Sequence, residues 1–309
     1  MPESEHKTAT PSFIYGTAWK KEATTDLVLA ALEAGFRAID TANQLIHYDE
    51  ARVGEALRIA AGRGIERAQL FLQTKFTSMS GQDSRLPYDS QAPLAAQVAQ
   101  SFESSLAHLH TDYLDSYVLH GPHYRRGLGE EDWEVWGAIE ALYESGRTKQ
   151  IGVSNVSLEQ LIALCEQARH KPMVVQNRCY AAFGWDQDVR RYCREQGITY
   201  QGFSLLTANR EVFVEPDVRA MAEKYGTGLA QIVFRFAMQI GMVPLTPSGL
   251  GVLEALLIPA VVALGAPQAT AVLGVISWRL FEFWAPIPIA GLAYLSLRFQ
   301  ERLTGRSPL

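Results

Sequence analysis

The chain has 309 residues, of which 48% are hydrophobic and 20% charged, and its net charge is −5. This length allows one large barrel domain or two smaller domains, and the absence of a basic cluster argues against nucleic acid as a partner. The three cysteines, Cys165, Cys179 and Cys193, form no CxxC pair. They fit a reducing compartment as small residues in or near a core, and they indicate no metal site. The polar N-terminus, MPESEHKTATPS, has no apolar segment typical of a secretory signal.

Short apolar or β-branched runs alternate with longer amphipathic stretches along the first 246 residues. In chain order, this pattern predicts a strand over 12–18, a helix over 24–34, a strand over 36–40, a helix over 51–61, a strand over 70–76, a helix over 92–109, a strand over 114–120, a helix over 133–145, a strand over 149–155, a helix over 158–169, a strand over 173–177, a helix over 187–196, a strand over 198–204, helices over 216–225 and 229–240, and a strand over 242–246. Repeated strand–helix alternation indicates a parallel sheet covered by helices. Eight strands favour a closed (β/α)₈ TIM barrel, and no GxGxxG motif supports a Rossmann fold instead.

Polar residues stand at successive strand ends, where such barrels place their reacting groups. Asp40 ends the second predicted strand, Lys75 lies in the third, His120 ends the fourth, and Tyr48 lies in the loop after the second. Taken singly, each has an ordinary structural role: a helix cap, a solvated lysine, a hydrogen-bonded core histidine and a surface aromatic. Their coincidence on one predicted barrel mouth favours a catalytic site.

Several motifs in the same order resemble those of the aldo-keto reductase family. They are YGTAWK (15–20), GFRAIDTANQLIHYDEARVGEAL (35–57), QTKF (73–76), YVLHGP (117–122), IGVSN (151–155) and VVQN (174–177). The match runs from about residue 13 to Thr246, and the motifs are specific only in combination. The resemblance implies a soluble, cytoplasmic NADPH-dependent carbonyl reductase built on a (β/α)₈ barrel.

The resemblance also implies a catalytic set of Asp40, Tyr48, Lys75 and His120. Tyr48 would donate a proton to the carbonyl oxygen, Lys75 would lower the pKa of Tyr48, Asp40 would hold Lys75, and His120 would orient the substrate by a hydrogen bond. The spacing from Asp40 to Tyr48 is two residues longer than in the common pattern. His47 stands beside Tyr48, and Tyr48 is preferred because the chemistry needs a phenol.

The cofactor site implied by the resemblance is NADP(H)-type. Its expected residues are Thr17, Ser154, Asn155, Gln176, Phe203 and Ser204. Ser154, Asn155 and Gln176 would hydrogen-bond the nicotinamide carboxamide, and Phe203 would stack on the nicotinamide or simply fill the barrel core. Trp19, with His120, would contact the substrate, and the loops 82–93 and 123–130 would contribute to selectivity.

The family pattern breaks off after the eighth strand. No Lys or Arg occurs between Arg235 and Arg279, so the basic clamp that holds the cofactor's 2′-phosphate in the family is absent from its usual place. We therefore expect the adenine end of the cofactor to bind weakly.

The chain from 247 to 309 is expected to form a second, membrane-like part after the barrel of 1–246. From Ala255 to Trp278 there are 24 residues without a charge, about the length of one membrane span. A second uncharged run over 283–297 predicts a helical hairpin over 250–297, with the barrel and the C-terminus in the cytoplasm. This tail resembles the terminal helices of a polytopic flippase-like membrane protein. A buried helix that closes the barrel, a natural fusion and an erroneous join of two genes are the alternatives.

The favoured function is NADPH-dependent reduction of a small aldehyde or ketone. The alternatives are a catalytically impaired, membrane-tethered barrel without the 2′-phosphate clamp, and a fragment of a membrane transporter that carries the barrel as a passenger.

Overall fold

The computed structural model describes residues 11–246, which belong to the unit Met1–Gly249. Its centre is a parallel sheet with the strand order β1 to β8, each strand pairing with the next along the chain. The strands are β1 (Tyr15–Gly16), β2 (Ala38–Asp40), β3 (Phe71–Phe76), β4 (Ser116–Leu119), β5 (Ile151–Ser154), β6 (Val174–Arg178), β7 (Thr199–Phe203) and β8 (Val243–Pro244). The predicted eight-stranded parallel sheet of a TIM-barrel fold is therefore confirmed.

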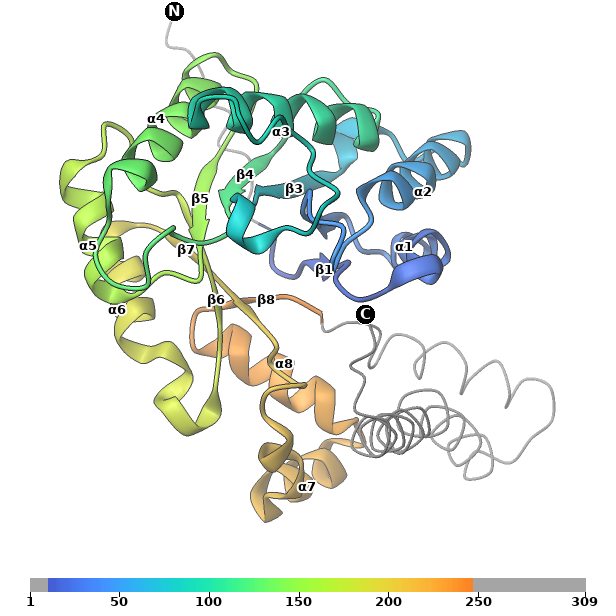
Figure 1. The fold of residues 1–309 in the computed structure, drawn as a ribbon. Coiled ribbons are helices and arrows are strands. Elements are labelled where there is room, and N and C mark those ends of the chain that lie inside the picture. Colours follow the sequence, from blue (N-terminus) through green and yellow to red (C-terminus); the bar gives the residue numbers. More distant parts are fainter. Residues whose placement is uncertain (1–10, 247–309) are drawn as a thin grey trace, which may run out of the picture. The chain divides into compact units, whose positions relative to one another are not determined.

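Helices follow the strands and lie around the outside of the sheet (Figure 1). They are α1 (Thr24–Glu33), α2 (Glu50–Gly62), α3 (Leu94–Leu109), α4 (Glu130–Glu144), α5 (Leu158–Gln167), α6 (Gln187–Gln196), α7 (Pro216–Tyr225) and α8 (Leu229–Gln239). These bounds lie close to the predicted ones. The sequence pattern does not predict the short 3₁₀ helices η1 (Lys21–Ala23), η2 (Arg67–Gln69), η3 (Met79–Gly81), η4 (Ala181–Asp186) and η5 (Arg210–Val214).

The first and last strands meet through backbone contacts. A parallel bridge joins Ile14 to Leu245, and the Ile14 amide donates to the Pro244 carbonyl at 3.1 Å. The Thr246 amide donates back to the Ile14 carbonyl at 3.0 Å, and the Gly16 amide donates to Thr246 Oγ1 at 2.9 Å. These contacts close the sheet on itself, so the carboxyl ends of all eight strands surround one mouth.

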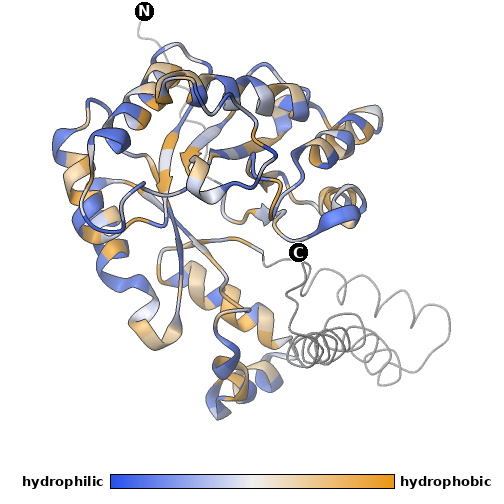
Figure 2. Ribbon diagram, viewed as in Figure 1, coloured by the Kyte–Doolittle hydropathy of each residue, from blue (hydrophilic) through white to orange (hydrophobic). Residues whose placement is uncertain are grey.

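Apolar packing fills the space between the sheet and its helices. The helices carry hydrophobic and hydrophilic positions in alternation along their length (Figure 2), and their buried residues include Val28, Val53, Phe102 and Trp136. The interior of the sheet is different, because several fully buried side chains there are polar. Buried polar groups need hydrogen-bond partners, and the network that satisfies them defines the candidate site.

The predicted tail, including the membrane hairpin over 250–297, lies outside the described residues. Within residues 11–246, no helix combines the length and apolar character that a membrane span requires. The hairpin and the flippase-like resemblance of the tail therefore stay predictions.

Candidate active site

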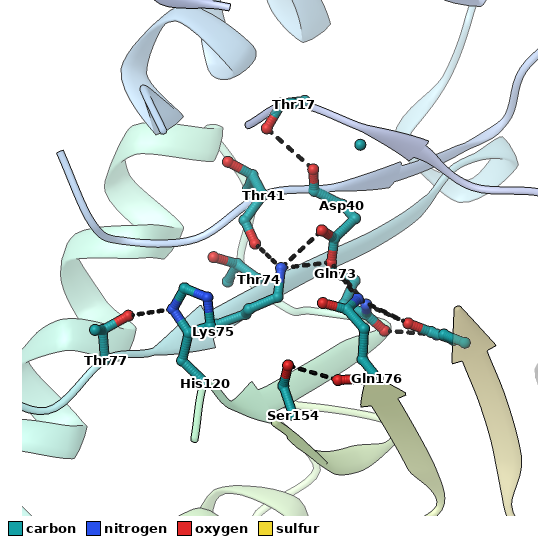
Figure 3. Close-up of polar contacts among 12 residues, drawn as sticks. Thr17, Asp40, Thr41, Gln73, Thr74, Lys75, Thr77, His120, Ser154 and Gln176 are labelled. Carbon is teal, nitrogen blue, oxygen red and sulfur yellow. Dashed lines mark hydrogen bonds and ion pairs between the residues drawn. The ribbon is translucent and has the colours of Figure 1, made fainter. Parts of the chain in front are cut away.

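A buried ion pair lies at the centre of the site. Lys75 Nζ, on β3, donates to both carboxylate oxygens of Asp40, at the end of β2, at 2.7 Å each, and to the Thr41 carbonyl at 2.7 Å (Figure 3). Both side chains are almost inaccessible, at 0% for Lys75 and 2% for Asp40. The expected pairing of Asp40 with Lys75 is present. These three bonds engage all three ammonium protons.

Glutamines from three strands form a network beside Asp40, and two of them donate to it. Gln73 and Gln176 donate to Asp40 Oδ1 at 2.7 and 3.0 Å, and both also donate to Gln201 Oε1, at 2.8 and 2.9 Å. Gln201 returns a bond to Gln73 at 3.0 Å. A carboxylate that accepts several hydrogen bonds and an ammonium is well satisfied despite its burial. This network fixes the ion pair from below the barrel mouth.

Tyr48 lies against this pair and against His120. Lys75 Nζ is 5.1 Å from the centroid of the Tyr48 ring, and the Tyr48 and His120 rings are 5.9 Å apart in an edge-on arrangement. His47 turns to the rim, where its ring is 4.1 Å from that of Trp19. Of the two adjacent residues His47 and Tyr48, it is therefore Tyr48 whose ring lies against the ion pair and His120.

The longer spacing between Asp40 and Tyr48 is taken up by a turn. The amides of His47 and Tyr48 both donate to the Gln44 carbonyl, at 3.3 and 3.0 Å. Asp49 then caps α2, because its Oδ1 accepts from the Arg52 amide at 3.1 Å. The turn and the cap together fix the backbone on both sides of Tyr48.

The pKa of Tyr48 moves in the opposite direction from the expected one. Burial raises it well above the usual value for a phenol, the Asp40 carboxylate raises it further, and Arg178 lowers it. The expected lowering by Lys75 does not prevail, because burial disfavours the phenolate and the Asp40 carboxylate opposes its negative charge. The pKa of Lys75 is itself lowered, chiefly by burial. The expectation of an acidified phenol is wrong for this arrangement, and Tyr48 holds its proton throughout the neutral range.

His120 is neutral at the mouth. Burial, with smaller contributions from Lys75 and His47, lowers the pKa of His120 to about 3. Its Nδ1 lies 2.7 Å from the hydroxyl oxygen of Thr77 (Figure 3). The Thr77 carbonyl is in turn bound by the Tyr88 hydroxyl at 2.9 Å and by the Gln82 amide at 3.4 Å. The 82–93 loop, expected to affect selectivity, thus anchors the partner of His120.

Three of the expected cofactor residues gather at the ends of β5 and β6. The Ser154 hydroxyl donates to the Gln176 carbonyl at 2.6 Å. The side-chain nitrogen Nδ2 of Asn155 donates to the His120 backbone carbonyl at 2.8 Å and to Ser154 Oγ at 3.1 Å. Ser154 and Gln176 are buried, whereas Asn155 is exposed at the mouth. Asn155 is therefore the member of this group that is open to a ligand.

The remaining expected residues divide into buried and accessible ones. Thr17 is fully buried, and its hydroxyl donates to the Asp40 carbonyl at 3.0 Å, so it supports the end of β2. Trp19 is 56% exposed at the rim. Phe203 and Ser204 are partly buried at the end of β7. Trp19, Asn155 and Ser204 have left-handed backbone angles, with φ of 62°, 54° and 57°. Such strained positions are enriched at functional sites.

The sequence interpretation missed two residues of the site, Thr77 and Arg178. Thr77 contacts His120, and the Arg178 guanidinium carbon lies 5.4 Å from the Phe203 ring centroid. Arg178 follows Gln176 by two residues in the same strand, so the period-two rule would have placed both side chains on one face. Nothing in the local sequence marks Thr77 as the partner of His120.

Comparisons with known proteins agree with the fold. The model of the Aldo/keto reductase family matches residues 12–275, so the match continues past Thr246, where the motif resemblance ends. A glyoxal reductase from Bacillus subtilis is 32% identical over 226 residues, covering 72% of each chain. An NADPH-dependent alpha-keto amide reductase from Saccharomyces cerevisiae is 30% identical over 255 residues, covering 75% of each. The crystal structure of an aldo-keto reductase enzyme from a Medee basin deep-sea metagenome library superposes with a TM-score of 0.66 at 26% identity, covering 77% of this chain and 80% of that one.

Proposed function

This chain belongs to the aldo/keto reductase family, and we propose that it reduces aldehydes or ketones to alcohols with NADP(H), with Tyr48 as the general acid. The observation that carries the proposal is the convergence of Tyr48 on the Lys75 ammonium, 5.1 Å from its ring, and on the His120 ring, at 5.9 Å. The direct test is consumption of NADPH by the purified protein in the presence of para-nitrobenzaldehyde, with formation of the benzyl alcohol measured by chromatography. No consumption at any aldehyde concentration would refute the proposal.

The residues at the mouth fit the nicotinamide end of the cofactor. Asn155 is exposed there, and within residues 11–246 no group donates to its Oδ1, which leaves that oxygen free to accept from a carboxamide. Phe203 and Ser204 at the end of β7 provide an aromatic ring and a strained backbone at the same mouth. When bound, the reduced nicotinamide supplies a hydride to the carbonyl carbon.

The chain's own residues supply the proton and the charge stabilisation. The carbonyl oxygen becomes an alkoxide, which is a stronger base than a phenolate, so the Tyr48 proton moves to it even though the pKa of Tyr48 is raised. The Lys75 ammonium, 5.1 Å from the ring, stabilises the phenolate that forms. Asp40 and the glutamines hold this ammonium in place, and neutral His120 donates a hydrogen bond to the same oxygen.

We propose that the Thr77 hydroxyl donates to Nδ1 of His120 and so selects the tautomer that this mechanism needs. Within residues 11–246, the Thr77 hydroxyl has Nδ1 of His120 as its hydrogen-bond partner. A hydroxyl that donates to Nδ1 places the ring proton on Nε2, from which it can be donated to the substrate oxygen. Thr77 is a positioning residue in this scheme.

We expect Thr77→Val to lower kcat/KM for para-nitrobenzaldehyde by about 2- to 10-fold, the value of one hydrogen bond. Thr77→Ser should restore most of the loss. The ¹⁵N chemical shifts of His120 report the tautomer directly, and they should show a mixture in Thr77→Val and one form in the wild type. Unchanged ¹⁵N shifts in Thr77→Val would contradict the proposed role of Thr77.

Because the pKa of His120 is about 3, the kcat/KM of the wild type should show no inflection from His120 between about pH 5 and pH 8.

We further propose that NADPH and NADH bind with similar affinity. No Lys or Arg stands between Arg235 and Arg279, and each charge-assisted bond to a phosphate is worth about 1.5–3 kcal/mol. Loss of two such bonds raises Kd for NADPH by roughly two to four powers of ten. Titration of protein fluorescence with each cofactor should give Kd values within about a factor of ten of each other.

A strong preference for NADPH would show that another residue, such as Arg210 at the start of η5, binds the 2′-phosphate. No measurable binding of either cofactor would favour the alternative of an impaired barrel. The residues that the family uses for this clamp correspond to a part of the chain that lies outside residues 11–246.

A further inference from the structure

Arg178 ends β6 at the barrel mouth, directly above the buried ion pair. The four preceding residues of β6 are buried and Arg178 is exposed. Side chains two apart on a strand share a face, so Arg178 lies on the face of Gln176, whose amide contacts Asp40 at 3.0 Å. In the register of β6 and β7, Gln176 pairs with Gln201 and Arg178 pairs with Phe203. Arg178 and Phe203 therefore form the layer above the glutamines, about 7 Å further along the strands.

The guanidinium is held by aromatic groups and not by an acid. Its carbon lies 5.4 Å from the Phe203 ring centroid, and its Nη1 lies 3.5 Å from the Tyr180 hydroxyl oxygen. Within residues 11–246, ion pairs with carboxylates engage other arginines and lysines, and none includes Arg178. Stacking on an aromatic ring orients a guanidinium and leaves its outer N–H groups available.

The charge of Arg178 acts on the reacting residues. It lowers the pKa of Tyr48 and that of His47, although other causes dominate both. These effects place Arg178 within electrostatic reach of the position where the carbonyl must lie.

We propose that Arg178 binds an anionic group, a carboxylate, on the carbonyl substrate, so that the enzyme prefers aldehydes and ketones that carry one. The inference rests on the proposed reductase function and specifies its substrate class. A carboxylate matches the planar fork of a guanidinium through two parallel N–H bonds. Trp19 would border the rest of the substrate with aromatic surface.

The test compares two aldehydes of nearly equal shape, para-carboxybenzaldehyde and para-nitrobenzaldehyde, which differ by one charge. The meta and ortho carboxy isomers sample other distances to the guanidinium. The wild type should show the higher kcat/KM for at least one carboxylated isomer over its nitro counterpart. Arg178→Met should lower that ratio by roughly 10- to 100-fold, and Arg178→Lys should retain part of it. The ratio is the measure because any effect of Arg178 on the acidity of Tyr48 is common to both aldehydes.

Two controls identify the origin of the effect. Arg194→Met removes the same charge from exposed Arg194 at the end of α6 and should leave the ratio unchanged. The Kd of NADPH, measured by fluorescence titration, should be the same in the wild type and in Arg178→Met. Benzoate binding, measured by calorimetry without turnover, should be lost in Arg178→Met.

Equal kcat/KM for all carboxylated and nitro pairs in the wild type would overturn the inference. So would an Arg178→Met variant that loses NADPH affinity and slows both aldehydes equally, because Arg178 would then serve the cofactor. If the wild type reduces neither aldehyde but binds benzoate in an Arg178-dependent manner, the reductase proposal fails and the anion site stands.

Discussion

Replacement of Tyr48 by phenylalanine should lower kcat for para-nitrobenzaldehyde by about 10²- to 10⁴-fold, the usual contribution of a general acid. In the proposed mechanism the phenol is the proton donor; its ring lies against both Lys75 and His120, and Tyr48→Phe removes its hydroxyl while retaining the ring. Cofactor affinity should change little, because the expected nicotinamide contacts come from β5, β6 and β7. The measurement is steady-state kinetics together with a fluorescence titration of NADPH.

His47→Ala is the matched control for this experiment. His47 stacks on Trp19 at the rim, with ring centroids 4.1 Å apart, so its loss should affect KM more than kcat. If His47→Ala abolishes turnover while Tyr48→Phe remains active, the assignment of the acid to Tyr48 is wrong.

Asp40→Asn should destabilise the fold by about 3–5 kcal/mol, because it leaves the Lys75 ammonium buried without its counter-ion. Lys75 is 0% exposed, and two of its three hydrogen bonds go to the Asp40 carboxylate. Activity should fall as well, because Lys75 no longer has a fixed position or a secure charge. Urea unfolding gives the change in free energy, and kinetics on the folded fraction gives the change in kcat.

The double variant Asp40→Asn/Lys75→Met separates the ion pair from simple packing. It removes both charges, so it should be less destabilised than the sum of the two single variants. The exposed pair Glu103–Arg147 serves as a control, and Glu103→Gln should cost no more than about 1 kcal/mol. Additive single effects at Asp40 and Lys75 would show that the pair is not coupled as the geometry implies.

Local sequence is sufficient to predict the strands and α-helices of residues 11–246, although not the short 3₁₀ helices. Their alternation follows from hydrophobic periodicity, from caps and from turn residues such as Gly35 and Gly146, which depend only on near neighbours. Because all the strands are parallel, the residues at their ends meet at one mouth, and the sequence alone therefore places Asp40, Lys75 and His120 together. The spacing also leaves Tyr48 and His47 as the two neighbouring candidates for the acid.

The contacts of the Tyr48 ring depend on tertiary structure, since they join the loop after β2 to Lys75 on β3 and to His120 after β4. The direction of the pKa shift of Tyr48 depends on it too. A pKa responds to burial and to charges brought together from distant parts of the chain, and local sequence contains neither. The pairing of Thr77 with His120 spans 43 residues. The stacking of Arg178 on Phe203 depends on the register of β6 with β7, and so both contacts are products of the closed sheet.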